Sequence, residues 1–377
     1  YLLFMLSIGI WFFYKNRSGG EKTYFLGGRQ MGPWVTALSA GASDMSAWVL
    51  MGLPTSIYAL GLGQAWISIG LLTGYSLSWI FQAPRLRRFS IVADDAITIP
   101  QYLSNRFLSK SYVLQVICAI VFLIAYTIYS ASSIKACGTL FNTVIGIDET
   151  YTMYLAAAII IGYTFLGGFK AVCWTDFFQG ILMLIALLAV PIIVRATQTL
   201  DVSALQNVYQ YTDASGAVVT CDFGAGLFSA SWKDIVSGLG WGLGYFGMPH
   251  IIVRFMSIEK PSMIKKSSIV AIIWVVLSIG AACLMAYYAR MIVAEELLTV
   301  GAQKTVFIVL ARRLFPAGIA GLLLAAIMAA SISTADSQLL VASSSFTSDL
   351  YQPLIRKNAS DREVLWVGRI AVVVISV

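Results

Sequence analysis

Long apolar stretches alternate with short polar segments along the whole chain. Most of the stretches reach the roughly 20 residues that a membrane-spanning helix needs. We number them one to ten, and they occupy about residues 1–14, 34–62, 64–84, 112–142, 152–170, 176–196, 229–257, 267–290, 317–345 and 365–377. The pattern predicts an all-α polytopic membrane protein. Because the chain begins without Met and ends inside an apolar stretch, we expect it to be part of a longer protein.

Two of the stretches contain residues that disturb a helix. Stretch seven holds five glycines and a proline between Gly238 and Pro249, and stretch two holds small residues and Asp44 between Ser39 and Ser46. Glycine costs about 1 kcal/mol and proline about 3 kcal/mol inside a helix, so both stretches are expected to unwind. Paired interruptions of this kind indicate a transporter binding site. The alternative is that the small residues only allow close helix packing.

The positions of these interruptions predict an inverted repeat. Stretches two to six form a five-helix unit at 34–196, an outer loop follows at 197–228, and a second unit at 229–377 lacks its last helix. An odd number of spans makes the second unit enter the membrane from the opposite side. The two interruptions then occupy equivalent positions, and residues 1–14 are a partial flanking helix. The expected fold is a five-plus-five inverted repeat with two broken helices.

Composition and charge agree with a membrane protein and give it an orientation. Hydrophobic residues make up 59% of the chain, charged residues make up 11%, and the mean hydropathy is +0.81. If the N-terminal end lies outside, 18 of the 25 lysines and arginines fall in cytoplasmic stretches, namely 15–29, 85–110, 168–175, 254–266 and 346–369. Basic loops remain cytoplasmic, so we expect this orientation. It explains the net charge of +7 without a nucleic-acid partner.

Cysteine and histidine are too sparse for several classes of enzyme. The five cysteines show no CxxC spacing, and His250 is the only histidine. Neither a disulfide framework nor a histidine-based metal cluster is therefore expected, and we interpret His250 as a packed or hydrogen-bonded residue. The sequence contains no nucleotide-binding P-loop motif. We expect no enzymatic activity, and uphill transport would have to use an ion gradient.

Stretch nine carries small and hydroxyl-bearing residues on one helical face. Ala330, Ser333, Thr334 and Ser337 follow the spacing i, i+3, i+4, i+7. Na⁺ is a hard cation that binds several oxygens, which these hydroxyls and the carbonyls of an unwound helix can supply. The alternative is that the hydroxyls bond only to carbonyls of their own helix.

Three aspartates lie within or beside apolar stretches, where an ionisable group indicates a functional site. Asp44 could be held by free N–H groups of its own unwound segment and favour a cation. Asp176 could instead lie at the cytoplasmic interface. Asp336 could join Asp176 and Ser337 in a second cation site.

Several runs of residues resemble the sodium/solute symporter family. They are YFLGGR at Tyr24–Arg29, ALSAGASDMS at Ala37–Ser46, WTD at Trp174–Asp176, GWGLGYFGMPH at Gly240–His250, and the pair Ser333–Thr334. The resemblance extends over the whole chain. It is specific because glycine breaks, an acid and aromatic residues occur in a fixed order. The family's fold is the leucine-transporter-like five-plus-five inverted repeat with flanking helices.

The resemblance implies which residues bind the ion and the solute. It implies that Na⁺ is bound by the carbonyls of Ala42, Met45 and Ala330 and the hydroxyls of Ser333 and Thr334, and Asp44 matches the acid needed for sodium coupling. The proline-type members are matched at the expected solute contacts, which are Trp48, Tyr129, Trp241, Tyr245 and Pro249. The expected function is import of L-proline with Na⁺ by alternating access across the bacterial cytoplasmic membrane.

Residue spacing alone leaves the solute and the class of protein open. Trp241, Tyr245 and Pro249 are four residues apart, so they form one stripe if the segment is helical, and a pyrrolidine ring could pack on it. The alternative is that the stripe packs on lipid or on helices. Aromatic pockets also suit another amino acid, a betaine-like osmolyte or pantothenate. A membrane sensor or channel that binds a solute without accumulating it is the alternative from another class.

Overall fold

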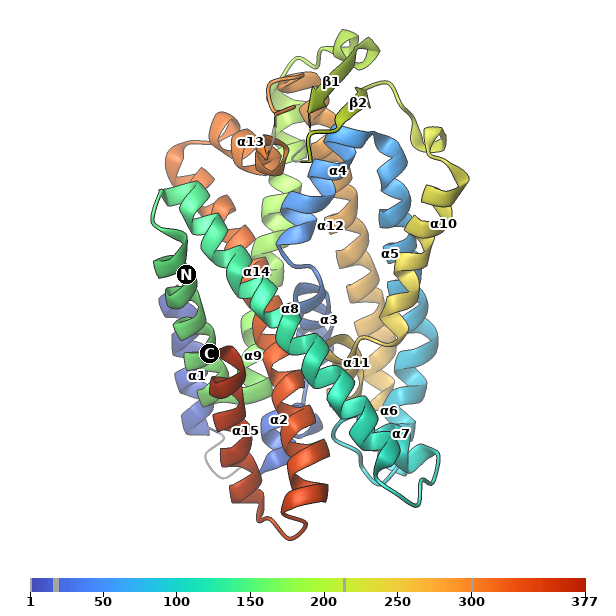
Figure 1. Ribbon diagram of the computed structural model, residues 1–377, viewed down its shortest axis with the longest axis vertical. Helices are drawn as coiled ribbons and strands as arrows, with labels where there is room; N and C mark the ends of the chain where they lie inside the picture. Colours follow the sequence, from blue (N-terminus) through green and yellow to red (C-terminus); the bar gives the residue numbers. More distant parts are fainter. Residues whose placement is uncertain (1, 16–19, 213–214, 300) are drawn as a thin grey trace.

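The computed structural model describes residues 2–15, 20–212, 215–299 and 301–377, and most of these residues are helical. The helices run side by side in an elongated bundle (Figure 1). A small β-hairpin and α13 lie at one end, and α2 and α7 lie at the other (Figure 1). Besides the helices described below, the bundle contains α1 (Leu2–Lys15), α2 (Glu21–Leu26), α5 (Ala65–Leu77), α6 (Ala83–Val92), α7 (Ile99–Arg106), α13 (Val306–Leu314) and α15 (Asp361–Ser376).

Among the described residues, four helices are long and apolar enough to cross a membrane. They are α8 (Val113–Ile145), α9 (Glu149–Thr197), α12 (Ile264–Ile292) and α14 (Ala317–Phe346). α14 packs against both α8 and α9, and α12 packs against α9. The predicted polytopic all-α class is therefore confirmed.

α9 combines the two predicted stretches 152–170 and 176–196. As a straight helix its 49 residues would extend about 74 Å, more than twice the hydrocarbon core of a bilayer. Gly168 interrupts the helix with φ 57° and ψ −153°. A Cβ at Gly168 would lie 2.5 Å from a ring carbon of Tyr24, so only glycine fits. The expected cytoplasmic stretch 168–175 is thus reduced to this one break, and the residues after it are already helical.

Both predicted broken helices are present. The first consists of α3 (Pro33–Asp44), a π-helical turn at Trp48–Gly52 and α4 (Leu53–Leu60). The second consists of α10 (Trp232–Gly240), a 3₁₀ turn at Trp241–Phe246 and α11 (Pro249–Ser257).

The glycines of the second broken helix serve two purposes. Gly238 and Gly242 pack directly on Gly70 and Gly74 of α5, because a Cβ on Gly242 would lie 2.2 Å from the carbonyl oxygen of Gly70. The alternative interpretation, that small residues allow close helix packing, therefore applies to Gly238 and Gly242. Gly247 lies at the break itself, between the 3₁₀ turn and α11.

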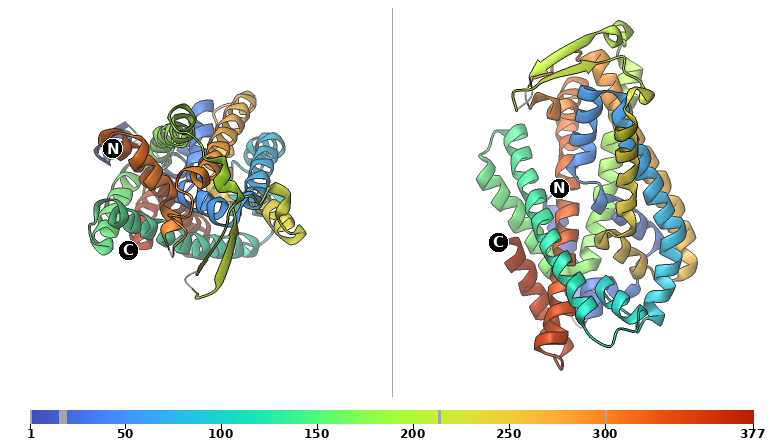
Figure 2. Two further views of the ribbon diagram at one scale, coloured as in Figure 1. Left: turned by 90° about the horizontal axis from the view of Figure 1, so that it is seen from above. Right: turned by 45° about the vertical axis from the view of Figure 1, so that its right-hand side comes forward.

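The stretch 197–228, which we predict to be an outer loop, contains the antiparallel hairpin of β1 (Val208–Thr212) and β2 (Val218–Asp222). The sequence did not predict this hairpin. The hairpin lies across one end of the bundle (Figure 2). Arg290 of α12 anchors the segment after it, donating from Nη1 to the carbonyl oxygen of Phe223 at 2.8 Å and from Nε to that of Tyr58 at 3.0 Å. The hairpin is thereby joined to α4 and α12.

Candidate functional site

The break after α3 frees backbone oxygens beside α14. The N–H of Ser46 donates to the carbonyl of Asp44 at 3.0 Å, so Ala42 loses its helical partner. The hydroxyl of Ser333 takes that place and donates to the carbonyl oxygen of Ala42 at 2.8 Å. A small and buried group of oxygens results where the two elements meet.

Four of the five predicted sodium ligands are connected in this way. On α14, the hydroxyls of Ser333 and Thr334 also donate to the carbonyl of Ala330 at 3.1 and 3.0 Å. These three residues and Ala42 are 0% exposed. Met45, the fifth, is buried in the break three residues after Ala42, and its N–H donates to the carbonyl of Gly41 at 2.9 Å.

A hydrogen bond connects the two broken helices. The hydroxyl of Tyr245 donates to Oδ2 of Asp44 at 2.5 Å. A tyrosine of the opposite break is thus a partner of Asp44, whereas the sequence suggested N–H groups of its own segment. Tyr245 is 2% exposed, and its ring makes an edge contact with Tyr75 at a centroid distance of 5.2 Å. Nothing in the sequence pointed to Tyr75.

The aromatic stripe predicted from the spacing of four is not formed. Trp241 is 50% exposed and Tyr245 is buried, because residues four apart share a face only in an α-helix and this turn is 3₁₀. Trp241 instead stacks on Trp48, with ring centroids 5.6 Å apart and an angle of 20° between the rings. Pro249 is buried as the first residue of α11.

Tyr129 reaches the same region from α8. It is 42% exposed, and its ring centroid lies 6.5 Å from that of Tyr126. The hydroxyl of Tyr126 is hydrogen bonded to Nδ1 of His250 at 2.9 Å, which confirms His250 as a packed, hydrogen-bonded residue. Tyr126 was missed, although it precedes Tyr129 by three residues and so lies near it on the helix surface.

Asp176, Asp336 and Ser337 form one buried network with Arg254 at its centre. Nη2 of Arg254 donates to Oδ2 of Asp176 and to Oγ of Ser337, both at 2.7 Å. Ser337 donates to Oδ1 of Asp336 at 3.1 Å, and Tyr163 donates to the other oxygen of Asp336. The three residues predicted for a second cation site are thus brought together, with a guanidinium among them.

The position of Arg254 differs from the sequence prediction. The sequence placed Arg254 in a cytoplasmic loop and left open whether Asp176 lay at the interface, but their side chains are 1% and 0% exposed. A cation stabilises a buried carboxylate, and Arg254 supplies one to Asp176 from the second broken helix. The apolar surroundings of Asp176 signalled that a partner existed, although not which one.

The chemistry available at the two breaks suits a hard monovalent ion and a small solute. Carbonyl and hydroxyl oxygens surround Ala42, and aromatic rings surround Tyr245. The described residues contain no group of three or more His, Cys, Asp or Glu side chains able to hold a metal ion. Oxygen-only coordination of this kind is typical of hard cations.

The family model described as "Sodium:solute symporter family" matches residues 24–377. The chain belongs to the sodium:solute symporter family. This symporter is 41% identical to the high-affinity proline transporter PutP of Bacillus subtilis, over 99% of this chain and 77% of that protein. It is 40% identical to the sodium/proline symporter of Staphylococcus aureus, over 100% of this chain and 72% of that protein. The predicted family is confirmed.

A solved structure shows the same fold. It is the substrate-bound, outward-open state of a Na⁺-coupled sialic acid symporter, with a TM-score of 0.76 and 21% identity, covering 100% of this chain and 78% of that one. The five-plus-five fold class with two broken helices is thereby confirmed. The protein is a multi-pass membrane transporter, and Na⁺ is its coupling ion.

Proposed function

We propose that this symporter imports L-proline together with Na⁺ by alternating access across the bacterial cytoplasmic membrane. The observation that carries the proposal is the hydrogen bond from Tyr245 to Asp44, because it joins the oxygen-rich break to the aromatic one. An ion bound at the first break can then influence a solute bound at the second. The names of two relatives, both at least 40% identical, favour proline over other small solutes.

The proposed Na⁺ site uses the carbonyls of Ala42, Met45 and Ala330 and the hydroxyls of Ser333 and Thr334. Hydrogen bonds among four of them support it, since oxygens already within about 3 Å of one another need only small shifts to coordinate one ion. Bound Na⁺ would hold the end of α3 against α14. The second cation site at Asp176, Asp336 and Ser337 stays a prediction, because a further cation there would have to share its ligands with Arg254.

The proposed solute site lies among Trp48, Tyr129, Trp241, Tyr245 and Pro249. We infer that the pyrrolidine ring packs on the exposed indole of Trp241, which Trp48 supports from behind by stacking. A cationic ammonium over an aromatic face contributes about 0.5 to 2 kcal/mol. The carboxylate can bind N–H groups near the N-terminus of α11, where the helix dipole favours an anion.

The orientation with the N-terminal end outside stays part of the proposal. It places α2 and α7 on the cytoplasmic side and the β-hairpin outside. The inward movement of one Na⁺ then releases enough free energy for uptake. One charge moving through 100 mV releases about 2.3 kcal/mol, and a tenfold Na⁺ gradient adds about 1.4 kcal/mol. Together they could concentrate a neutral zwitterion about 500-fold.

Uptake of radiolabelled proline into proteoliposomes tests the proposal. We expect accumulation with an inward Na⁺ gradient and none when K⁺ replaces Na⁺. The double variant Ser333→Ala/Thr334→Ala should lose Na⁺-dependent accumulation, because two of the five ligand oxygens are removed. Ser331→Ala is the matched control, since Ser331 is not among the proposed ligands and its hydroxyl donates to the carbonyl of Ile327 in its own helix.

Three other results would each reject one part of the proposal. Unchanged uptake by the double variant would exclude the ion site. Na⁺-driven uptake of a betaine or pantothenate, with no competition by proline, would exclude the solute. Proline binding without accumulation would favour a sensor over a symporter.

A further inference from the structure

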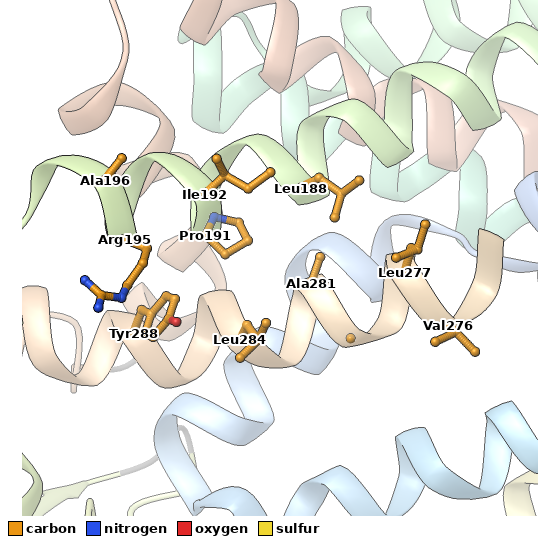
Figure 3. Close-up of a pocket in the computed structure, with 11 residues that line it drawn as sticks. Leu188, Pro191, Ile192, Arg195, Ala196, Val276, Leu277, Ala281, Leu284 and Tyr288 are labelled. Atoms are coloured by element: carbon orange, nitrogen blue, oxygen red, sulfur yellow. The ribbon is translucent and has the colours of Figure 1, made fainter. Parts of the chain in front are cut away.

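A groove between α9 and α12 opens on the side of the helix bundle. Its volume is about 510 Å³. Figure 3 shows Leu188 and Ile192 of α9 facing Leu277 and Leu284 of α12 across it. None of the residues proposed for the ion or the solute lines this groove. It is therefore a separate feature of the molecule.

The groove exists because the facing helix surfaces carry small residues between larger ones. Gly280 forms part of its lining, and a Cβ on Gly280 would meet no atom outside its own helix within 4 Å. Ala281 beside it is 3% exposed, whereas the bordering Ile192 and Leu284 are 60% and 48% exposed. In a bilayer these exposed apolar side chains face lipid.

The length of the groove matches one leaflet of the membrane. Its lining on α12 runs from Val276 to Tyr288. Twelve helical steps of 1.5 Å extend about 18 Å. Half of the bilayer's hydrocarbon core is about 15 Å thick. One extended acyl chain therefore fits along the groove.

One end of the groove is polar and positively charged. Arg195 and Tyr288 lie together there, while the other end is apolar (Figure 3). Arg195 is exposed in the last turn of α9, and the ion pairs found within the described ranges do not include it. Such a cation can stabilise the helix end alone, but that role requires no particular lipid. A cation at the mouth of an apolar groove also complements an anionic headgroup.

We propose that this groove binds one anionic glycerophospholipid. An acyl chain lies between the leucines of α9 and α12, the phosphate contacts Arg195, and the hydroxyl of Tyr288 donates a hydrogen bond to the headgroup. The bound lipid fills the space over Gly280 and Ala281. It thereby stabilises the packing of α12 against the part of α9 that follows Gly168.

Native mass spectrometry of the detergent-purified protein, with phosphatidylglycerol or phosphatidylcholine added, tests this site. One cation near a headgroup of net negative charge contributes about a five-fold preference over a zwitterionic headgroup, whose phosphate charge is balanced by its own ammonium. We expect the wild type to prefer phosphatidylglycerol by about that factor and Arg195→Gln to lose the preference. Gly280→Leu should bind one lipid fewer of either kind, because its side chain enters the groove.

Two variants serve as matched controls. Lys233→Gln removes an exposed cation of α10 outside the groove, and Gly321→Leu adds a side chain at an exposed glycine of α14 that also has open space around its Cβ. Both should bind lipid as the wild type does. The proposal is overturned if Arg195→Gln keeps the preference, if Gly280→Leu binds as many lipids as the wild type, or if the controls lose as much.

Discussion

Asp95 is a residue whose charge holds several segments together at the end of the bundle that carries α2 and α7. Its Oδ1 accepts a hydrogen bond from Nε of Arg29 at 2.9 Å, and Lys22 pairs with Oδ2. Arg29 also donates to the carbonyls of Met256 at 2.6 Å and Ala96 at 2.9 Å. One buried guanidinium therefore connects the end of α11 to the loop that contains Asp95.

These contacts predict how stability depends on pH. Partial burial acts to raise the pKa of Asp95, but Lys22 and Arg29 outweigh it, so the pKa lies below its ordinary value of 3.8. A carboxyl group whose pKa is lower in the folded than in the unfolded protein adds stability at any pH above its unfolded-state pKa. That stability is lost as the pH falls through its folded-state pKa. The contribution should thus be constant near neutral pH and disappear below about pH 4.

Thermal unfolding of wild type and Asp95→Asn in detergent measures this contribution. We expect Asp95→Asn to be less stable by on the order of 1 kcal/mol from pH 5 to 8, since the carboxylate is half exposed. The difference should shrink as the pH falls below about 4. Asp94→Asn is a control, because Asp94 is the exposed neighbour of Asp95 and the ion pairs found within the described residues do not include it. A stability difference that grew on acidification would contradict the assignment.

Local signals in the sequence indicated the residues proposed for the ion site but not all of their partners. Ser333 and Thr334 were proposed because hydroxyls recur on one helical face, and Ala42 because the family resemblance implied it. Arg254 could not be paired with Asp176 from sequence, since 78 residues separate them and only the fold brings them together. Its place at the end of an apolar stretch favoured a loop.

At the scale of elements, the contact between α5 and the second broken helix depends on glycine. Gly70 and Gly74 meet Gly238 and Gly242, and a Cβ at Gly242 would overlap the backbone of Gly70. A backbone atom cannot rotate away as a side chain can. Any side chain at Gly242 must therefore push α5 away from the turn that carries Trp241 and Tyr245.

We expect Gly242→Ala to destabilise the protein by about 1 to 3 kcal/mol and to weaken proline binding. Gly240→Ala is the control, because Gly240 has a helical φ of −59° and open space around its Cβ. It should be neutral or more stable by up to about 1 kcal/mol. Unfolding temperature and radiolabelled proline binding in detergent report both effects. If the two variants had the same unfolding temperature and the same proline binding, the contact between α5 and the turn at Gly242 would tolerate separation.

Elements were predictable where the pattern was long and periodic. Both broken helices were expected from glycine and proline, and the apolar stretches correspond to the observed helices. The β-hairpin was missed because its strands are only five residues long and lie in a stretch interpreted as a polar loop, although Val208–Thr212 and Val218–Asp222 contain valines and tyrosines typical of strands. The sequence correctly predicted that α9 is divided near Gly168. The helical part after this break begins earlier in the chain than Lys170 and Asp176 suggested.

At the scale of the whole molecule, the fold follows from the count and order of apolar stretches, and the solved sialic acid symporter has the same fold. The division into repeats at 34–196 and 229–377 stays a prediction. Its physical content is that the two breaks face each other, and the bond between Tyr245 and Asp44 agrees with it. Sequence separation hides such a contact, because it spans 201 positions.

That contact predicts coupling between ion and solute. If Na⁺ raises the affinity for proline by some factor, proline must raise the affinity for Na⁺ by the same factor, which is typically about 5 to 150. Tyr245→Phe keeps the ring and removes the hydroxyl that reaches Asp44. We expect it to reduce this factor toward one while leaving Na⁺ affinity without proline little changed.

Two experiments measure this coupling factor independently. One compares the binding of radiolabelled proline with and without Na⁺, and the other compares the binding of ²²Na⁺ with and without proline. Tyr75→Phe is the matched control, because Tyr75 touches the ring of Tyr245 but its hydroxyl is not the one that donates to Asp44. It should keep the full factor. If Tyr245→Phe bound proline more weakly by the same ratio at every Na⁺ concentration, the hydroxyl would serve the solute alone. Coupling would then have to pass through the packing of α3 against α11 and not through Asp44.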